Sequence, residues 1–190
     1  MKRHLLFKIL GGIFLAGFVF AVAGIAVVAQ LIKDLPSPEQ FIGKKITQST
    51  NIYDREGTTL LYEIHGEEKR TIISYHEIPT YIQQATIAIE DQSFYTHHAF
   101  DWRGFVRAVF VNIIRGRLAQ GGSTITQQLA RNAFLTSEKT FTRKIKELVL
   151  AYWIEKNYSK DQILGLYLNQ IPYGSNAYGV EAASQTYFNK

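Results

Sequence analysis

The 190-residue chain contains no cysteine. This absence excludes a disulfide framework, a zinc site with thiolate ligands and a cysteine nucleophile. Charged residues are also sparse at 19%, against 46% hydrophobic residues, which excludes a disordered composition. The 12 phenylalanines and 11 tyrosines are enough to fill a packed core or to line an amphipathic surface.

No acidic residue occurs in the first 33 positions, which carry Lys2, Arg3, Lys8 and Lys33. Residues 9–29 form an uncharged run that would span about 31 Å as a helix, close to the hydrocarbon thickness of a bilayer. The positive-inside rule then predicts a cytoplasmic N-terminus with the rest of the chain outside. The alternative is a signal peptide cleaved after Ala29, although the apolar run is long for one.

The predicted organisation has four parts and is mainly α-helical. We expect a cytoplasmic N-terminus over 1–8, a transmembrane anchor over 9–32, a linker with a small β element over 33–78, and a helical domain over 79–190. Strands at 52–53 and 60–64 flank a turn at 54–57, where Gly57 supplies a positive φ. A further strand is predicted at 69–75, a turn at 172–174 and a helix from Val180.

Helical periodicity begins at Pro79, and serines mark several helix starts. We expect N-caps at Ser123 and Ser137, and a capping box of Ser159 with Gln162 that opens a helix ending near residue 169. The helix after Ser137 is predicted to turn these residues inward: Phe141, Ile145, Leu148, Val149 and Tyr152. An apolar stripe after residue 102 has two interpretations, core or membrane contact, and consists of Phe105, Val106, Val109, Phe110, Ile113 and Ile114.

Acidic residues are scarce again between residues 102 and 146, a segment that contains nine basic residues and a single acidic one, Glu138. A local balance of +8 predicts an anionic partner, which is phosphate, a phospholipid headgroup or nucleic acid. Nucleic acid conflicts with the predicted extracytoplasmic side.

Two carboxylate positions are candidates for chemistry. Glu90 and Asp91 precede Phe94 and His97, so one carboxylate could occupy a partly apolar site, where burial would make it a better base. The alternative is a solvated helix C-terminus. Glu147 follows Arg143 and Lys144 on one helix face. It is either in an exposed ion pair or held among cations that grip an anionic leaving group.

The segment GGSTITQQLARN, residues 121–132, is a candidate phosphate site because two glycines precede a helix N-terminus with free N–H groups. Arg131 would add a charged clamp. The alternative is a simple capped helix, but polar groups nearly surround this one. His97 and His98 have no third ligand at metal-like spacing, so a hydrogen-bonding role is favoured over a metal site.

Five segments in order resemble the signatures of the family 51 glycosyltransferases, the peptidoglycan glycosyltransferases. They are EDQSFYTHHAFDWRGFVRA, GGSTITQQLARN, RKIKE, KDQILGLYLNQIPYG and GVEAASQTYFNK. The preceding stretch, STNIYDREGTTLLYEIHGEEKRTIISYHEIP, resembles the segment between anchor and transferase in class A penicillin-binding proteins, which implies a bifunctional parent protein. Two positions depart from the family pattern, Ala99 for a glycine and Arg131 for a lysine. The domain is expected to be incomplete at its C-terminus.

The resemblance implies a lysozyme-like, mainly α fold that polymerises lipid II with undecaprenyl pyrophosphate as leaving group. Glu90 resembles the general base and Glu147 the second catalytic carboxylate, which orients the cations. The expected substrate-binding residues are Asp91, Phe94, His97, Thr124, Gln127, Gln128, Arg131, Asn132, Lys139, Arg143 and Lys144.

The implied partners are lipid II, the lipid-linked glycan strand, the bacterial inner membrane and other cell-wall synthesis proteins. A divalent cation, Mg²⁺ or Mn²⁺, assists at the pyrophosphate in some relatives, although the sequence shows no dedicated metal site. Two alternatives remain open: a lysozyme-like hydrolase, and a catalytically silent membrane-anchored module that binds glycan or lipid II.

Overall fold

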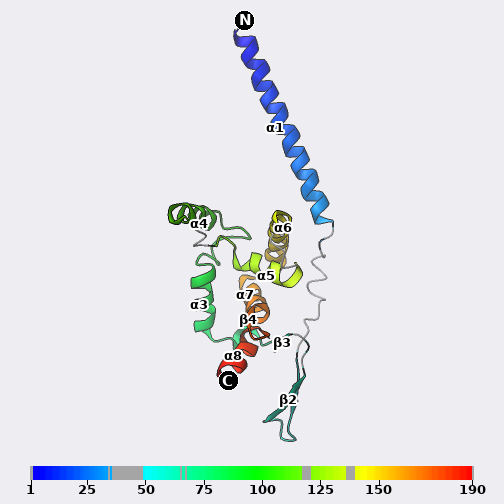
Figure 1. The fold of residues 1–190 in the computed structure, drawn as a ribbon, viewed down its shortest axis with the longest axis vertical. Coiled ribbons are helices and arrows are strands. Elements are labelled where there is room, and N and C mark those ends of the chain that lie inside the picture. Colours follow the sequence, from blue (N-terminus) through cyan, green and yellow to red (C-terminus); the bar gives the residue numbers. More distant parts are fainter. Residues whose placement is uncertain are drawn as a thin grey trace.

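The computed structural model describes residues 2–33, 35, 49–64, 66, 68–116, 121–135 and 140–189. The predicted cap Ser137 and the predicted ligand Lys139 lie outside these residues. One long helix, α1 (Lys2–Ile32), projects from one end of the molecule, and a β-hairpin lies at the opposite end (Figure 1). Between them lies a mainly helical body that contains the predicted signatures.

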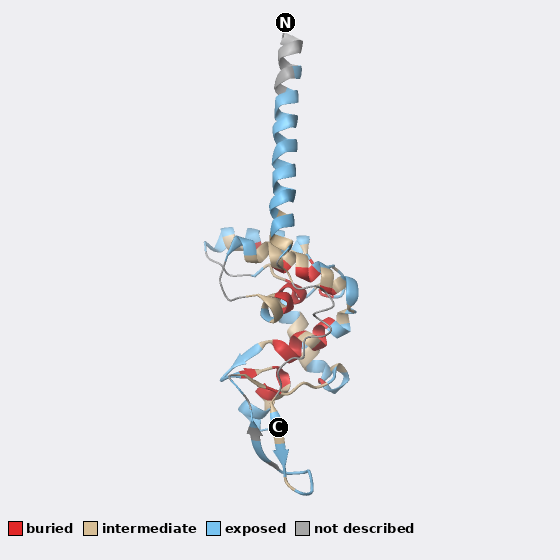
Figure 2. Ribbon diagram, turned by 90° about the vertical axis from the view of Figure 1, so that its right-hand side faces the viewer, coloured by how far each residue is buried: buried red, intermediate tan, exposed pale blue. Residues whose placement is uncertain are grey.

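Helix α1 is long and apolar enough to cross a membrane. Its segment Leu10–Ile32 has a mean hydropathy of 2.5, and its side chains are exposed along most of its length (Figure 2). A signal sequence near an N-terminus has the same length and composition, so the anchor and its orientation remain predictions.

The hairpin was predicted closely. Strands β1 (Thr50–Tyr53) and β2 (Leu60–Ile64) pair antiparallel, and the turn between them contains Gly57 with φ +71°. The predicted third strand is shorter than expected, because only β3 (Lys69–Arg70) pairs and Tyr75 begins a short 3-10 helix. β3 joins a small sheet of order β3-β5-β4 with β4 (Pro172–Gly174) and β5 (Ala177–Tyr178).

The turn predicted at 172–174 lies two to three residues further along the chain. Residues 172–174 form strand β4, and the chain reverses at Ser175 and Asn176, which have φ values of +48° and +57°. Asparagine and serine tolerate this conformation better than most side chains because they hydrogen-bond locally.

The body is built from six helices in the described part of the chain. They are α3 (Thr80–Glu90), α4 (Trp102–Arg115), α5 (Ile125–Phe134), α6 (Phe141–Asn157), α7 (Lys160–Gln170) and α8 (Val180–Phe188). Two N-caps lie one and three residues after the predicted serines, at Thr124 and Thr140. The Ser159–Gln162 capping box is present as predicted.

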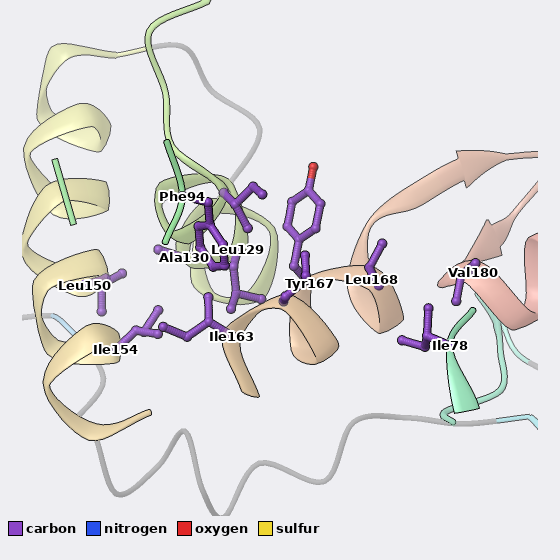
Figure 3. Packing of buried hydrophobic residues seen from close by; sticks show 12 residues of the cluster. Ile78, Phe94, Leu129, Ala130, Leu150, Ile154, Ile163, Tyr167, Leu168 and Val180 are labelled. Atoms are coloured by element: carbon purple, nitrogen blue, oxygen red, sulfur yellow. The ribbon is translucent and has the colours of Figure 1, made fainter. Parts of the chain in front are cut away.

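The hydrophobic core lies where α5, α6 and α7 meet (Figure 3). Leu129 and Ala130 on α5, Leu150 and Ile154 on α6, and Ile163 on α7 are all buried in it. This packing fixes α5 between its neighbours, so side chains on its two flanks are held at defined positions.

The predicted inward face of α6 is wrong in part. Phe141 and Tyr152 are exposed, and the other three predicted residues are half-buried. The buried face contains Glu147, Leu150 and Ala151, because the helix turns the glutamate toward α5.

The apolar stripe of α4 is also outside the core. Its six side chains are between 41% and 72% exposed, which contradicts the core interpretation; membrane contact stays a prediction. The helix lies at the end of the body nearest α1 (Figure 1). Asp101 caps it by accepting a hydrogen bond from the backbone N–H of Gly104.

The turn before α8 yields a stability prediction. Gly179 has φ +85° and ψ 156°, and an added Cβ would lie 2.7 Å from the carbonyl oxygen of Asn169. This conformation is nearly restricted to glycine, and the contact would force backbone atoms apart. We expect Gly179→Ala to lower the free energy of unfolding by about 2–4 kcal/mol, measured by thermal unfolding in detergent.

The matched control is Gly116→Ala. Gly116 also has a positive φ, +59°, but an added Cβ meets nothing within 4 Å. We expect a loss of about 1–2 kcal/mol there. Equal losses at both positions would contradict the close contact.

Candidate active site

Glu90 is the last residue of α3, and its side chain is exposed. The amide Nε2 of Gln128, on α5, donates a 2.8 Å hydrogen bond to Glu90 Oε2. No other hydrogen bond reaches this carboxylate from the residues that the structure describes. Oε1 is therefore available to accept a proton from a substrate hydroxyl.

Asp91, in contrast, is buried and ties the following loop to α5. Its Oδ1 lies 2.8 Å from His97 Nε2, and its Oδ2 accepts a 3.1 Å hydrogen bond from the backbone N–H of Ile125. A carboxylate at a helix N-terminus is favoured by the free N–H groups and the helix dipole. Of the acidic pair, it is therefore Asp91 and not Glu90 that occupies the partly apolar site beside the buried Phe94.

His97 is held between two acceptors. Nε2 faces Asp91 and Nδ1 faces the carbonyl of His98. Burial alone would lower the pKa of His97, but the hydrogen bonds with Asp91 and His98 outweigh it and raise the pKa. The protonated imidazolium, which donates from both nitrogens, satisfies this site best.

Ligand atoms of Asp91, His97 and Asp101 lie within 4.8 Å of one another, yet this group does not fit a metal ion. The Asp101 oxygens accept hydrogen bonds from Ser93 and Gly104. In its protonated form His97 donates from both nitrogens and offers no lone pair. His97 is hydrogen-bonded in this cluster, which is the role favoured for it from the sequence.

The start of α5 is fastened to the same loop by two buried side chains. Thr124 donates to the carbonyl of Ala99 at 3.2 Å and accepts from the backbone N–H of Gln127 at 3.2 Å. Gln127 Nε2 donates to the same carbonyl at 2.8 Å. Both side chains are almost fully buried, so they position the loop; their predicted contact with substrate stays a prediction.

Lys144, on α6, uses all three of its ammonium protons on protein acceptors. Nζ lies 2.7 Å from Ser123 Oγ, 2.9 Å from Gln127 Oε1 and 2.9 Å from Glu147 Oε2. The three acceptors come from the loop before α5, from α5 and from α6. One ammonium group therefore fixes the position of α6 relative to the start of α5.

Glu147 is 1% exposed and contacts two cations. Besides Lys144, Arg143 Nη1 lies 2.8 Å from Oε1, in an ion pair without hydrogen-bond geometry. Within the described residues, Glu147 Oε1 and Arg143 Nε are buried without a hydrogen-bond partner. The pairing that the spacing predicted is present, but it is buried rather than exposed, and Arg143 retains an unused N–H donor.

A polar hollow of about 400 Å³ lies beside these groups. Its lining includes Glu90, the Gly121–Gly122 loop, Ser123 and Arg107. Ser123 connects the hollow to Lys144 through the 2.7 Å hydrogen bond. A ligand in the hollow would therefore meet the free carboxylate oxygen of Glu90 and, through Ser123, the ammonium group of Lys144.

A second, mostly apolar hollow of about 860 Å³ shares Glu90 with the first. It is lined by aromatic side chains that include Tyr81, Tyr173 and Tyr187. Burial and the negative charge of Glu90 raise the pKa of Tyr173, which shows that the carboxylate lies near this wall.

The other predicted residues lie along α5 or outside the described chain. Arg131 is half-buried, and its Nε lies 3.5 Å from Oδ1 of the exposed Asn132. The sequence motifs did not single out Arg107, which lines the polar hollow, or Tyr167, whose hydroxyl donates to Gln128.

Comparison with known proteins agrees with this geometry. A family model described as Transglycosylase matches residues 57–190. The chain belongs to the transglycosylase family. The sequence-based assignment to family 51 and to a mainly α, lysozyme-like fold is thereby confirmed.

Similar proteins are penicillin-binding proteins. The chain is 48% identical over 160 residues to penicillin-binding protein 1A of Aquifex aeolicus (strain VF5), and 48% identical over 144 residues to penicillin-binding protein 1F of Bacillus subtilis (strain 168). It is 42% identical over 187 residues to penicillin-binding protein 1A of Neisseria gonorrhoeae. These matches cover 84%, 75% and 96% of this chain, but 22%, 20% and 23% of the relatives. The chain thus spans about a fifth of the length of these transglycosylase relatives.

The raised pKa of His97 predicts a pH-dependent stability. A folded-state pKa above the ordinary value of 6.5 gives a contribution that is complete below pH 6.5 and is lost as pH rises through the folded-state pKa. We expect the thermal unfolding midpoint of this transglycosylase to fall as pH rises above 6.5, measured by circular dichroism in detergent.

His97→Gln should flatten that dependence, since the titrating group is gone. The matched control is His98→Gln, which removes the exposed neighbouring imidazole and should leave the slope unchanged. An unaltered slope in His97→Gln would contradict the assignment.

Proposed function

We propose that this chain is the glycosyltransferase part of a bifunctional penicillin-binding protein, and that it polymerises lipid II into glycan strands. The observation that carries the proposal is a polar hollow with one carboxylate on its lining and a second, cation-bound carboxylate connected to that lining. Glu90 lines the hollow with a free oxygen. Ser123, which also lines it, accepts a hydrogen bond from Lys144, and Lys144 and Arg143 both pair with the buried Glu147. Membership of the transglycosylase family supports the same conclusion.

The first role belongs to Glu90. Its Oε1 takes the proton from the acceptor's sugar hydroxyl as that oxygen attacks the anomeric carbon of the donor. The new carbon–oxygen bond forms on the face opposite the pyrophosphate, whose own bond to carbon breaks. The electron pair leaves with the pyrophosphate and the configuration inverts, because base and leaving group lie on opposite sides of the carbon.

The second role is stabilisation of the leaving pyrophosphate. A phosphate oxygen that enters the hollow can replace Ser123 Oγ on Lys144, because Gln127 and Glu147, the other two acceptors, are buried. Charge that develops on the pyrophosphate would then meet fixed cations, with Glu147 holding them in place. Arg131 and Lys139 are proposed to add to this cation cluster.

The proposal extends to the surroundings of the site. We infer that the catalytic part lies on the outer side of the bacterial inner membrane with α1 as anchor, and that it works with other cell-wall synthesis proteins. A divalent cation that accompanies the pyrophosphate also stays a proposal. Because no group of described residues fits a metal, no catalytic step is assigned to one.

The apolar stripe of α4 is proposed to enter the membrane interface, next to the lipid-linked substrates. Apolar side chains on an amphipathic helix gain about 25 cal/mol per Å² when they leave water. Arg103, Arg107 and Arg115 on the same helix suit anionic headgroups. Such a position would bring the hollow to the depth at which lipid II presents its pyrophosphate.

Two other functions fit the site less well. A hydrolase would use water as the acceptor and has no need of fixed cations behind the leaving group. A silent binding module has no need of a carboxylate oxygen left free for a proton.

Product analysis with lipid II distinguishes the three functions. The protein that contains this chain should convert lipid II to polymer, and Glu90→Gln should lower the rate by at least about 1,000-fold, because the amide cannot take a proton. Gln84→Glu, at an exposed position on the same helix and away from both hollows, is the control for a changed charge and should retain polymerisation. Shortened glycan would indicate a hydrolase, and undiminished polymerisation by Glu90→Gln would remove that residue from its role.

The membrane position of α4 can be tested by fluorescence. Trp102 is 65% exposed at the start of α4, and Trp153→Phe would leave it as the single tryptophan. We expect its emission to be quenched in liposomes with brominated acyl chains. The reciprocal variant, Trp102→Phe, reports Trp153 on α6 as the comparison. No quenching of Trp102 would contradict membrane contact.

A further inference from the structure

Tyr167 is a buried tyrosine of α7 whose hydroxyl leaves the hydrophobic core. The residue is 2% exposed, and its ring packs with the core cluster while the oxygen points away from it (Figure 3). The hydroxyl donates a 3.2 Å hydrogen bond to Gln128 Oε1. Gln128 then donates through Nε2 to Glu90 at 2.8 Å. Three helices, α7, α5 and α3, are thus joined by one chain of hydrogen bonds that ends at the proposed base.

The Glu90 carboxylate sets the donor-to-acceptor direction of these hydrogen bonds. An ionised carboxylate only accepts hydrogen bonds, so Gln128 must present its NH₂ group to Glu90. The amide oxygen then faces Tyr167, which must donate. Burial, together with the negative charge of Glu90, raises the pKa of Tyr167, and the hydroxyl therefore stays protonated and able to donate at any working pH.

We propose that Tyr167 is a positioning residue for Glu90, acting through the Gln128 amide. This role rests on the function proposed above, and it gives Tyr167 no contact with the substrate. Its part is to hold Gln128 in one orientation, so that one oxygen of Glu90 is fixed and the other is free to take the proton.

Glu90 needs such a support because its side chain and that of Gln128 are both accessible to solvent. Glu90 is an exposed side chain at a helix end, and Gln128 is only half-buried, so neither is held by packing alone. Tyr167 is immobilised among Leu129, Ile163 and Leu168. A rigid ring thus orients a flexible amide, which in turn orients a flexible carboxylate, and small displacements of a catalytic group can cost large factors in rate.

A purely structural hydroxyl predicts a different outcome. Its loss would lower stability by the value of one hydrogen bond and leave turnover unchanged. The proposed role predicts that turnover falls while substrate affinity does not, since the arrangement acts on the proton acceptor and not on the bound lipid.

The experiment uses Tyr167→Phe in the full-length protein that contains this chain, with lipid II polymerisation followed at several substrate concentrations. We expect kcat to fall on the order of 10-fold, equivalent to about one lost hydrogen bond, with KM within about 2-fold of the original value. The matched control is Tyr95→Phe. Tyr95 donates a 2.8 Å hydrogen bond to Asp161 at the start of the same helix, α7, and its loss should leave kcat unchanged.

A double-mutant cycle tests whether the effect passes through Gln128. In a Gln128→Met background, Tyr167→Phe should have no further effect on kcat, because the amide that it orients is gone. An equal loss in both backgrounds would overturn the proposal, and so would an unchanged kcat in Tyr167→Phe alone. If Tyr167→Phe does not fold, Gln128→Met decides by itself: a fall in kcat at constant KM supports positioning, while a rise in KM at constant kcat overturns it.

Failure of this inference is separable from failure of the proposed function. If Glu90→Gln abolishes polymerisation while Tyr167→Phe does not alter kcat, only the positioning role is wrong. If Glu90→Gln polymerises normally, the function assigned to Glu90 is wrong and the role of Tyr167 falls with it.

Discussion

The structure depends most on one ammonium group, Nζ of Lys144, which three protein acceptors surround. It neutralises the buried carboxylate of Glu147 and fastens α6 to the start of α5. Without this ammonium group, Arg143 would be the one remaining cation beside the buried carboxylate among the described residues, in an ion pair without hydrogen-bond geometry. The buried carboxylate of Glu147 holds the two cations in place beside the leaving group. In turn, the carboxylate can stay buried only because the cations balance its charge.

Helix α5 transmits this arrangement to the other side of the site. Consecutive helical residues project about 100° apart, so the adjacent Gln127 and Gln128 reach different neighbours. Gln127 accepts from Lys144 on one flank, and Gln128 donates to Glu90 on the other. Two neighbouring glutamines thus set the position of the base relative to the cations. The core residues on the third side of α5, Leu129 and Ala130, keep the helix from rotating.

The sequence identified most of these residues but not how they are distributed between surface and interior. The spacing of Arg143, Lys144 and Glu147 predicted their ion pairs. Hydrophobic periodicity placed the buried face of α6 only in part, because it cannot count a buried glutamate as an inward residue. The acidic pair was recognised, but only the fold shows that Asp91 is buried and Glu90 exposed. Tyr167 could not be predicted as a support, since an aromatic residue within an apolar helix has the same pattern whether or not its hydroxyl has a partner.

The most direct measurement is a crystal structure of the protein with a bound lipid pyrophosphate analogue that carries an intact donor sugar. The account predicts a pyrophosphate oxygen within hydrogen-bond distance of Lys144 or Arg143, in place of Ser123. It also predicts the Glu90 carboxylate on the opposite side of the sugar's anomeric carbon. A pyrophosphate bound away from both cations, with Lys144 still donating to Ser123, Gln127 and Glu147, would contradict it.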